Sequence, residues 1–180
     1  MGVSIMAGAT VASLAGAASP RDGLVQLGLQ LANLNSRQCL TVTGGGLDDN
    51  AIVIQQPCRR DASFRWRFVA VGRAGTFLIE NVRSGRCLTV AGDSVEDNGF
   101  AVQFRCANAD PSQQWRVRRP AGALLTVPAG QALLENGRSH RCLTIAGGSV
   151  AAGGVAVQYA CDQQRSRQWS VRIVAGPALE

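Results

Sequence analysis

A ten-residue pattern occurs three times in this 180-residue chain and constrains its fold more than any other feature. The pattern is N-x-x-S-x-x-C-L-T-[VI], and its copies begin at Asn33, Asn81 and Asn136. After each copy come a second cysteine and then a tryptophan. Self-similarity at such a period is typical of an architecture in which one supersecondary unit is repeated.

The six cysteines have the same spacing in every copy: Cys39 and Cys58, Cys87 and Cys106, Cys142 and Cys161. Six cysteines allow fifteen pairings. Because each copy must satisfy the same geometry by itself, equal spacing favours pairing within the copies, and each closed loop would stabilise the fold by about 3 kcal/mol. Six reduced thiols are the alternative. A zinc site is disfavoured because the chain has one histidine and no C-x-x-C.

Short alternating or β-branched runs predict strands in the first copy at 29–31, 39–42, 51–54 and 66–69. Glycine, asparagine and aspartate separate these runs, and no helical period is kept after residue 24. One copy is too small to bury its apolar face alone, so the three copies must share a core. We expect about twelve strands in an all-β fold with pseudo-threefold symmetry, divided into repeats at about 24–70, 71–120 and 121–175.

The two ends of the chain are treated separately. Residues 1–23 are expected to be a signal-like or disordered segment, because an uncharged stretch of small and apolar residues ends near Ala15–Ser19 but lacks a basic leader. Residues 176–180 are expected to form a tail. The apolar stretch is shorter than the ~20 residues of a membrane-spanning helix, so no membrane span is expected. Disulfides persist outside the cytosol, which agrees with a secreted protein.

All 18 basic residues are arginines, and the formal net charge is +6. The arginines are scattered and often stand beside Asp or Glu, which favours a solvated surface over a basic groove. Polyanion binding through arginine pairs such as Arg59–Arg60 is a minor hypothesis, and nucleic acid is not an expected partner. Such binding would weaken steeply with salt.

In the second copy, the segments Ser84–Leu88, Asn98–Gly99, Val102–Cys106 and Gln113–Trp115 resemble the ricin-B-type β-trefoil lectin repeat. That family carries a Q-x-W signature and includes the type 13 carbohydrate-binding modules of secreted bacterial hydrolases. The resemblance covers residues 24–175. It implies a β-trefoil of three four-stranded repeats. It also implies that Trp66, Trp115 and Trp169 belong to the core, which is the default for an indole with a polar handle.

The resemblance also implies where a sugar would bind and shows where this chain departs from the family. The family's aspartate positions are Thr41, Thr89 and Thr144, and its asparagine positions are Ser63, Ser112 and Ser166. The aromatic positions are Gln56, Phe104 and Tyr159. A threonine hydroxyl does not replace a bidentate carboxylate, so the usual galactose mechanism is disfavoured.

A non-standard carbohydrate site is therefore the prediction, with Tyr159 and Phe104 as the stacking aromatics. Polar residues of the neighbouring loops would form hydrogen bonds with the sugar hydroxyls. These residues are Asn108, Asp162, Gln163, Asp93 and Asp97. Gln55, Gln103 and Gln158 recur at one register and are expected to make structural hydrogen bonds.

The function that follows is that of a secreted, monomeric, lectin-like module whose weak sites gain by multivalency on a polysaccharide or glycoconjugate. The alternative is a protein-interaction or inhibitor module that has lost sugar binding. We do not expect an enzyme, a metal or a cofactor. His140 is the only histidine, and no catalytic motif surrounds it. The adjacent carboxylates lie in turns and do not face one another across a cleft.

Overall fold

The computed structural model describes residues 27–120 and 130–175, so the signal-like segment and the tail lie outside the described residues. Strands and short 3-10 turns make up the described fold. The strands are β1 (Leu27–Asn33), β2 (Cys39–Val42), β3 (Val53–Gln56), β4 (Trp66–Ala70), β5 (Thr76–Asn81), β6 (Cys87–Val90), β7 (Ala101–Phe104), β8 (Gln114–Arg118), β9 (Gly130–Asn136), β10 (Cys142–Ile145), β11 (Ala156–Tyr159) and β12 (Gln168–Ala175). The turns are η1 (Thr43–Gly45), η2 (Ala62–Phe64), η3 (Ala91–Asp93), η4 (Ala146–Gly148) and η5 (Arg165–Arg167).

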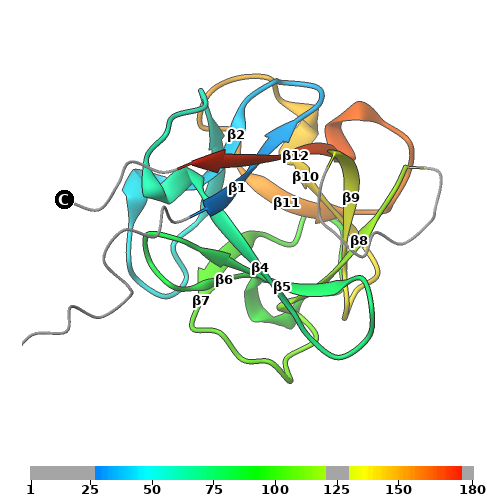
Figure 1. Ribbon diagram of the computed structural model, residues 1–180. Helices are drawn as coiled ribbons and strands as arrows, with labels where there is room; N and C mark the ends of the chain where they lie inside the picture. The colour runs from blue at the N-terminus through cyan, green and yellow to red at the C-terminus, as the bar shows by residue number, and fades with distance from the viewer. Residues whose placement is uncertain (1–26, 121–129, 176–180) are drawn as a thin grey trace, which may run out of the picture.

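Six of the strands form a closed antiparallel barrel. The neighbours around it are β1, β4, β5, β8, β9 and β12, and β12 returns to pair with β1. Figure 1 shows β1 and β12 side by side, at opposite ends of the colour range. Closure of the barrel leaves no free sheet edge in these strands.

The other six strands form three hairpins, β2–β3, β6–β7 and β10–β11, one in each repeat. Isolated bridges join the hairpins to one another, Ile52 to Val102, Ile54 to Val155 and Phe100 to Val157, so that together they form one cap. A barrel with a three-hairpin cap is a β-trefoil, which confirms the fold expected from the sequence.

The third strand of the first repeat begins later than predicted, at Val53 instead of residue 51. Ile52 forms an isolated bridge with Val102 of the second repeat, and its carbonyl still accepts a hydrogen bond from the amide of Thr43 across the hairpin. The prediction that this apolar run is extended is therefore confirmed, but Ile52 contributes to the contact between two cap hairpins and not to the third strand itself. The 3-10 turns after β2, β6 and β10 were not predicted.

Equivalent residues of the three repeats fill the core together. All three tryptophans are fully buried, and each indole Nε1 donates to the carbonyl of the leucine after the first cysteine of its own repeat. The acceptors are Leu40, Leu88 and Leu143, which are themselves buried in the same cluster. A buried indole is thus both packed and hydrogen-bonded, as its stability requires.

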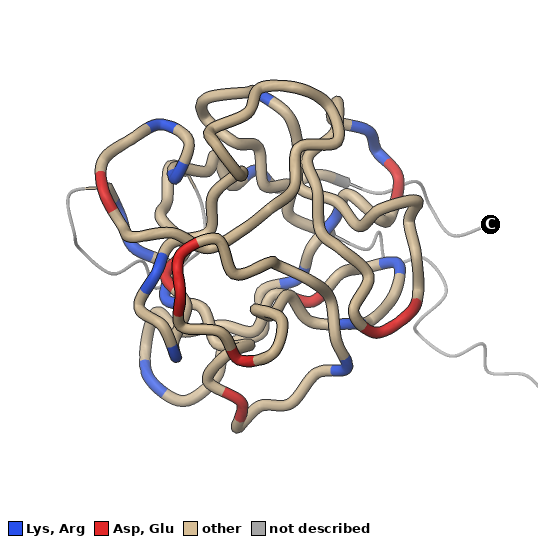
Figure 2. Tube along the Cα trace, turned by 180° about the vertical axis from the view of Figure 1, so that it is seen from behind, with Lys and Arg blue, Asp and Glu red and all other residues tan. Residues whose placement is uncertain are grey.

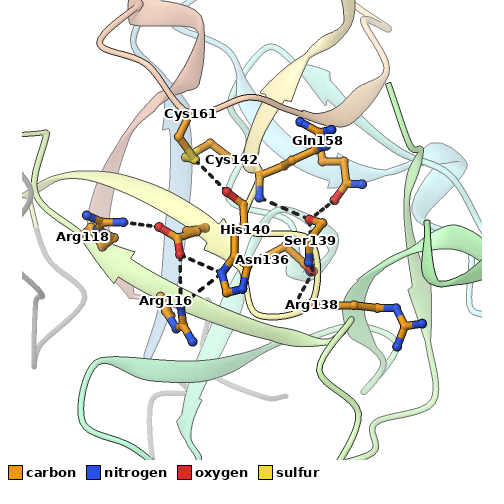
Figure 3. Close-up of polar contacts among 11 residues, drawn as sticks. Arg116, Arg118, Asn136, Arg138, Ser139, His140, Cys142, Gln158 and Cys161 are labelled. Atoms are coloured by element: carbon orange, nitrogen blue, oxygen red, sulfur yellow. Dashed lines mark hydrogen bonds and ion pairs between the residues drawn. A yellow bond between two sulfur atoms is a disulfide. The ribbon is translucent and has the colours of Figure 1, made fainter. Parts of the chain in front are cut away.

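The three disulfides join the cysteines within each repeat, with a sequence separation of 19 in every case, which confirms the predicted pairing. Each bond links the first strand of a cap hairpin to the loop after the second strand. Figure 3 shows the bond between Cys142 and Cys161 beside the turn that contains His140.

The repeated asparagine, serine and glutamine connect each repeat to the one before it. Asn136 accepts from the amides of Arg138 and Ser139 and donates to the carbonyl of Ser112 in repeat two at 2.7 Å. The hydroxyl of Ser139 donates to the side-chain oxygen of Gln158 (Figure 3). The side-chain nitrogen of Gln158 in turn donates to two backbone carbonyls in a loop of the second repeat. Gln55 and Gln103 make the same kind of contact. These glutamines hold the repeats in register.

Candidate functional site

A surface pocket of about 400 Å³ lies in repeat three between the cap hairpin and η5. It combines an aromatic ring with several polar groups. Its lining is Thr144, Ile145, Gly147, Gly148, Val157, Tyr159, Asp162, Gln164, Ser166 and Arg167, together with Asn98 from repeat two.

The floor of this pocket is neutral, and its threonine hydroxyl is bonded within the protein. Thr144 donates its hydroxyl hydrogen to the carbonyl of Ser166 at 2.9 Å, and both residues are buried. Thr41 does the same to Ser63 at 3.1 Å, and the hydroxyls of Thr89 and Ser112 lie 3.0 Å apart. At the positions that carry aspartate in the resembled family, each threonine hydroxyl is therefore bonded to the serine that stands at the family's asparagine position, through the serine carbonyl in repeats one and three and through its hydroxyl in repeat two.

Arg167 organises the wall of the repeat-three pocket. Its guanidinium carbon lies 4.8 Å from the ring centroid of Tyr159, within the range of a cation–π contact. Its Nη1 lies 3.2 Å from an Asp162 oxygen and donates to the Gln164 side chain at 2.9 Å, and its Nε donates to the Ala160 carbonyl. Only 9% of the arginine side chain is exposed, whereas Tyr159 keeps 36% of its surface. A buried cation thus holds an exposed ring, a carboxylate and an amide in place.

Of the predicted site residues, the structure brings Tyr159 and Asp162 together in this pocket. Gln163 turns away from it, because its amide donates to the Pro120 carbonyl in a separate hollow of about 280 Å³. Asp97 is engaged in a link between repeats, where its carboxylate accepts from the amide of Ala160 at 2.9 Å and pairs with Arg141 at 2.7 Å.

The remaining predicted residues belong to repeat two. Phe104 ends β7 and is half-buried, with the Arg105 guanidinium 5.7 Å from its ring centroid. Asn108 is exposed, and its carbonyl accepts from the Gln114 side chain. Asp93 is exposed at the end of η3. These residues lie around a different hairpin from Tyr159 and do not contribute to its pocket.

The sequence analysis missed three residues of the repeat-three pocket. Arg167 stands where repeat two has Gln113, and this departure was a signal that the local contacts differ. Gln113 donates to the Arg105 carbonyl as Arg167 does to that of Ala160, but it brings no charge. Gln164 lies two residues after the predicted Asp162 but was not itself predicted as a site residue. Asn98 comes from another repeat, and no local pattern connects it with Tyr159.

A second pocket, of about 540 Å³, occupies the equivalent place in repeat one. Its lining includes Gln56, Arg59, Asp61, Phe64 and, from repeat two, Arg83. Hydrogen bonds from Ser63 hold the pKa of Asp61 below its usual value; burial opposes this effect, and the charges of Arg83 and Arg65 add to it. Asp61 is therefore a carboxylate at any ordinary pH.

The described residues contain neither a cluster of metal ligands nor a membrane-spanning helix. Between 27 and 120 and between 130 and 175, no three His, Cys, Asp or Glu side chains gather closely enough to hold a metal ion. Within the same ranges, no helix has the length and hydrophobicity needed to cross a membrane.

Comparison with known proteins gives one family and many solved structures. A model of the ricin-type beta-trefoil lectin domain-like family matches residues 21–105, 65–127 and 111–178. No curated protein sequence matches significantly. Among solved structures, the designed threefold-symmetric protein ThreeFoil has a TM-score of 0.71 at 24% identity, over 79% of this chain and 96% of that one.

Two natural proteins also match. An exo-β-1,3-galactanase from Clostridium thermocellum has a TM-score of 0.73 at 26% identity, over 83% of this chain but only 30% of the galactanase chain. The Rhizoctonia solani agglutinin has a TM-score of 0.67 at 14% identity, over 80% of this chain and 93% of the agglutinin. At that identity the agglutinin shows the shared fold alone.

Proposed function

The chain belongs to the ricin-type β-trefoil lectin-like family, and from this premise we propose that it is a secreted carbohydrate-binding module whose principal sugar site is the repeat-three pocket. The observation that carries the proposal is the grouping of exposed Tyr159 with Asp162, Gln164 and Asn98 around one hollow. A pyranose ring offers a C–H face that can lie on an aromatic ring and hydroxyls that can bond to a carboxylate and to amides. Sites with an apolar platform and a few convergent polar groups suit such ligands.

The site would act differently from the family's galactose pocket. The Thr144 hydroxyl on the floor is already bonded to the Ser166 carbonyl, so the sugar would be oriented by Asp162 on the wall. Because Arg167 already neutralises part of that carboxylate, each contact is modest. Weak binding at one pocket is then strengthened by multivalency, when several pockets engage one polymer.

Polysaccharide retention tests this proposal. We expect the protein to be retained on an insoluble glycan panel that begins with β-1,3-galactan, because the galactanase that this chain partly matches is named for that polymer. Tyr159→Ala should weaken binding about tenfold, which corresponds to about 1.4 kcal/mol of lost stacking. Ile173→Ala removes an exposed apolar side chain on β12, outside both pockets, and should bind as the unaltered protein does.

Retention on none of the glycans would contradict the proposal. So would equal binding by the Tyr159→Ala and Ile173→Ala variants, because the retained protein would then be using another surface.

A specific observation favours protein interaction as the second candidate. Large apolar side chains at equivalent positions of the repeats are exposed on the cap: Leu47, Val95 and Val150 after the first hairpin strands, and Ile52 and Phe100 before the second. Apolar side chains exposed on one part of a protein mark an interaction site where they join into one contiguous patch. If a protein partner is the ligand, Leu47→Ser together with Phe100→Ser should abolish capture of that partner, and free sugars should not compete.

Export and the absence of catalysis complete the proposal. Three disulfides within one small domain support an oxidising compartment outside the cytosol. His140, the single histidine, lies 3.4 Å from Glu135 and 3.2 Å from Arg116 in an ion-pair network and faces no nucleophile in these contacts. Figure 2 shows arginines spread over the trace among acidic residues, which favours sugar over polyanion binding.

A further inference from the structure

The lining of the repeat-one pocket carries a net positive charge, whereas the charges of Asp162 and Arg167 balance in the repeat-three pocket, and we propose that the repeat-one pocket binds an acidic sugar, a uronic acid residue whose carboxylate meets Arg59 and Arg83. This inference rests on the proposed carbohydrate function and names a ligand class for a second pocket. Guanidinium groups present paired N–H donors that match a carboxylate and form the stronger, charge-assisted hydrogen bonds.

The two arginines reach the pocket from different repeats. Arg59 follows Cys58 in the loop after β3, and its carbonyl is held by the side chain of Gln30. Arg83 belongs to the turn after β5 and lies over the glycine edge of the pocket. A Cβ placed on Gly45 would come within 3.4 Å of the Arg83 Nε. Gly45 has a φ of 63°, which favours glycine, and the bare backbone there leaves space for the guanidinium.

The lining of this pocket carries one net positive charge. Arg59 and Arg83 are the basic residues, and Asp61 is the acidic one. Asp61 lies 4.0 Å from Arg83 and both are about half exposed, so their attraction leaves the guanidinium accessible. Arg59 is exposed, and no ion pair joins it to another residue of 27–120 or 130–175, so nothing in these ranges neutralises its charge.

The same two positions have lost their positive charge in repeat three. The residue after the second cysteine is Asp162 there, where repeat one has Arg59. The position of Arg83 is taken by Asn35, whose amide donates to the Gly148 carbonyl at 3.0 Å. The one arginine lining that pocket is buried and paired with Asp162. The two pockets therefore share a backbone and differ in the charge of the ligand that they favour.

The rest of the repeat-one pocket suits a sugar ring. At the border of the pocket, the Asp61 carboxylate can accept hydrogen bonds from sugar hydroxyls, and the Gln56 amide can both donate and accept them. Ile54 and Phe64 form the apolar base of the pocket. The volume of about 540 Å³ falls within the range of small-molecule sites. A free inorganic anion would use only the arginines and leave these groups unused.

Two matched glycosides distinguish the pockets by NMR of the ¹⁵N-labelled protein. Methyl α-D-galactopyranosiduronate and methyl α-D-galactopyranoside differ only in the C6 carboxylate. We expect the acidic glycoside to shift the amide signals of Gly44 and Gly45, and the neutral one to shift those of Gly147 and Gly148. Arg83→Gln and Arg59→Gln should each weaken binding of the acidic glycoside about tenfold and leave the neutral one unaffected. Arg60→Gln removes the same charge from a neighbouring exposed residue that does not line the pocket, and should change acidic binding less than twofold.

Other results of these titrations would contradict the acidic preference of the repeat-one pocket, the proposed function, or both. Equal shifts of Gly44 and Gly45 by the two glycosides, or no effect of either arginine substitution, would overturn the acidic preference. Competition by sodium sulfate as strong as that by the uronide would show a simple anion site and would also overturn it. Neutral binding at repeat three without acidic binding at repeat one removes this inference alone. No binding of either glycoside, joined to no retention on the glycan panel, removes the proposed function as well.

Discussion

The junction between repeats two and three and the junction between repeats three and one have the same backbone plan but different chemistry. At the first, Arg116 of β8 pairs in register with Glu135 of β9. Figure 3 shows Arg116, Arg118 and His140 converging on one carboxylate, which the contacts identify as that of Glu135. At the closing junction the equivalent pair is Ser170 of β12 and Ala32 of β1.

The cap hairpins also differ in charge between these two junctions. Between repeats two and three, Asp97 accepts from the Ala160 amide and pairs with Arg141. At the closing junction the three equivalent positions are Ala152, Pro57 and Gln38. Proline has no N–H, so a carboxylate at position 152 would find no backbone donor.

The closing junction relies on a longer ladder instead. The register of β1 and β12 runs from Leu27 opposite Ala175 to Asn33 opposite Trp169, whereas that of β8 and β9 runs only from Trp115 to Arg118. The asparagine anchor is present in both, since Asn33 donates to Ser166 as Asn136 does to Ser112. The same fold thus accommodates either ion pairs or a long backbone ladder at a junction between repeats. The two residues that face one another are both charged at one junction (Arg116 and Glu135) and both uncharged at the other (Ser170 and Ala32).

The largest expected effect comes from placing a charge at the neutral junction. Ala32 is 3% exposed and packs near Cys39 and Phe64, so Ala32→Glu would bury a carboxylate with no partner and should lower the free energy of unfolding by about 3 kcal/mol or more. Denaturant unfolding with intact disulfides measures it. Adding Ser170→Arg should restore part of the loss, because it recreates the facing pair of β8 and β9.

Ala32→Gln separates the two causes of that loss. It has nearly the size of glutamate without the charge. If it destabilises as much as Ala32→Glu, crowding and not charge explains the difference between the junctions.

An intermediate effect is expected from pH at the charged junction. Burial of Glu135 would by itself raise the pKa of its carboxyl, but Arg118 above all, and then His140 and Arg116, lower it below the ordinary 4.5. A lowered folded-state pKa contributes stability above the unfolded value, and this contribution is lost as the pH falls through the folded-state pKa. Glu135→Gln should therefore cost about 1–2 kcal/mol at pH 7, where the arginines are partly solvated, and progressively less as the pH falls through the lowered pKa of Glu135.

Unfolding measured from pH 7 to pH 3 tests the sign of this effect. Arg172→Gln, on the barrel strand of the neutral junction, is the control and should show no pH-dependent difference from the unaltered protein. A constant cost of Glu135→Gln across the range would show that shape, and not ionisation, matters at this position.

The smallest effect concerns the cap. Asp97→Ala should destabilise by about 1 kcal/mol, because the Ala160 amide and Arg141 lose a partner. The reverse change, Ala152→Asp, should do nothing while Pro57 is present and should stabilise by up to about 1 kcal/mol once Pro57→Ala supplies an N–H. A double-mutant cycle measures the coupling; additivity of the two changes would refute the explanation.

The sequence predicted what is repeated better than what differs. Equal cysteine spacing and the recurring N-x-x-S pattern were sufficient for the pairing and the threefold plan, because each copy meets the same local constraints. Shared lining of one pocket could be predicted only for residues that are neighbours in the chain, as Tyr159 and Asp162 are. Asn98 and Arg83 enter pockets of other repeats, and the role of Asp97 depends on an amide 63 positions away, so these contacts follow from the packing of the repeats and not from local pattern.

The pairing of Leu27 with Ala175 has a consequence for how the gene could be arranged. Since β1 and β12 are adjacent, a short peptide could join them, and new termini could be opened at the exposed residues 72–74 between β4 and β5. Such a circular permutant would keep every strand partner and every disulfide, because each bond lies within one repeat. The second unit would then be translated first, so the order in which the units leave the ribosome is not dictated by the native architecture.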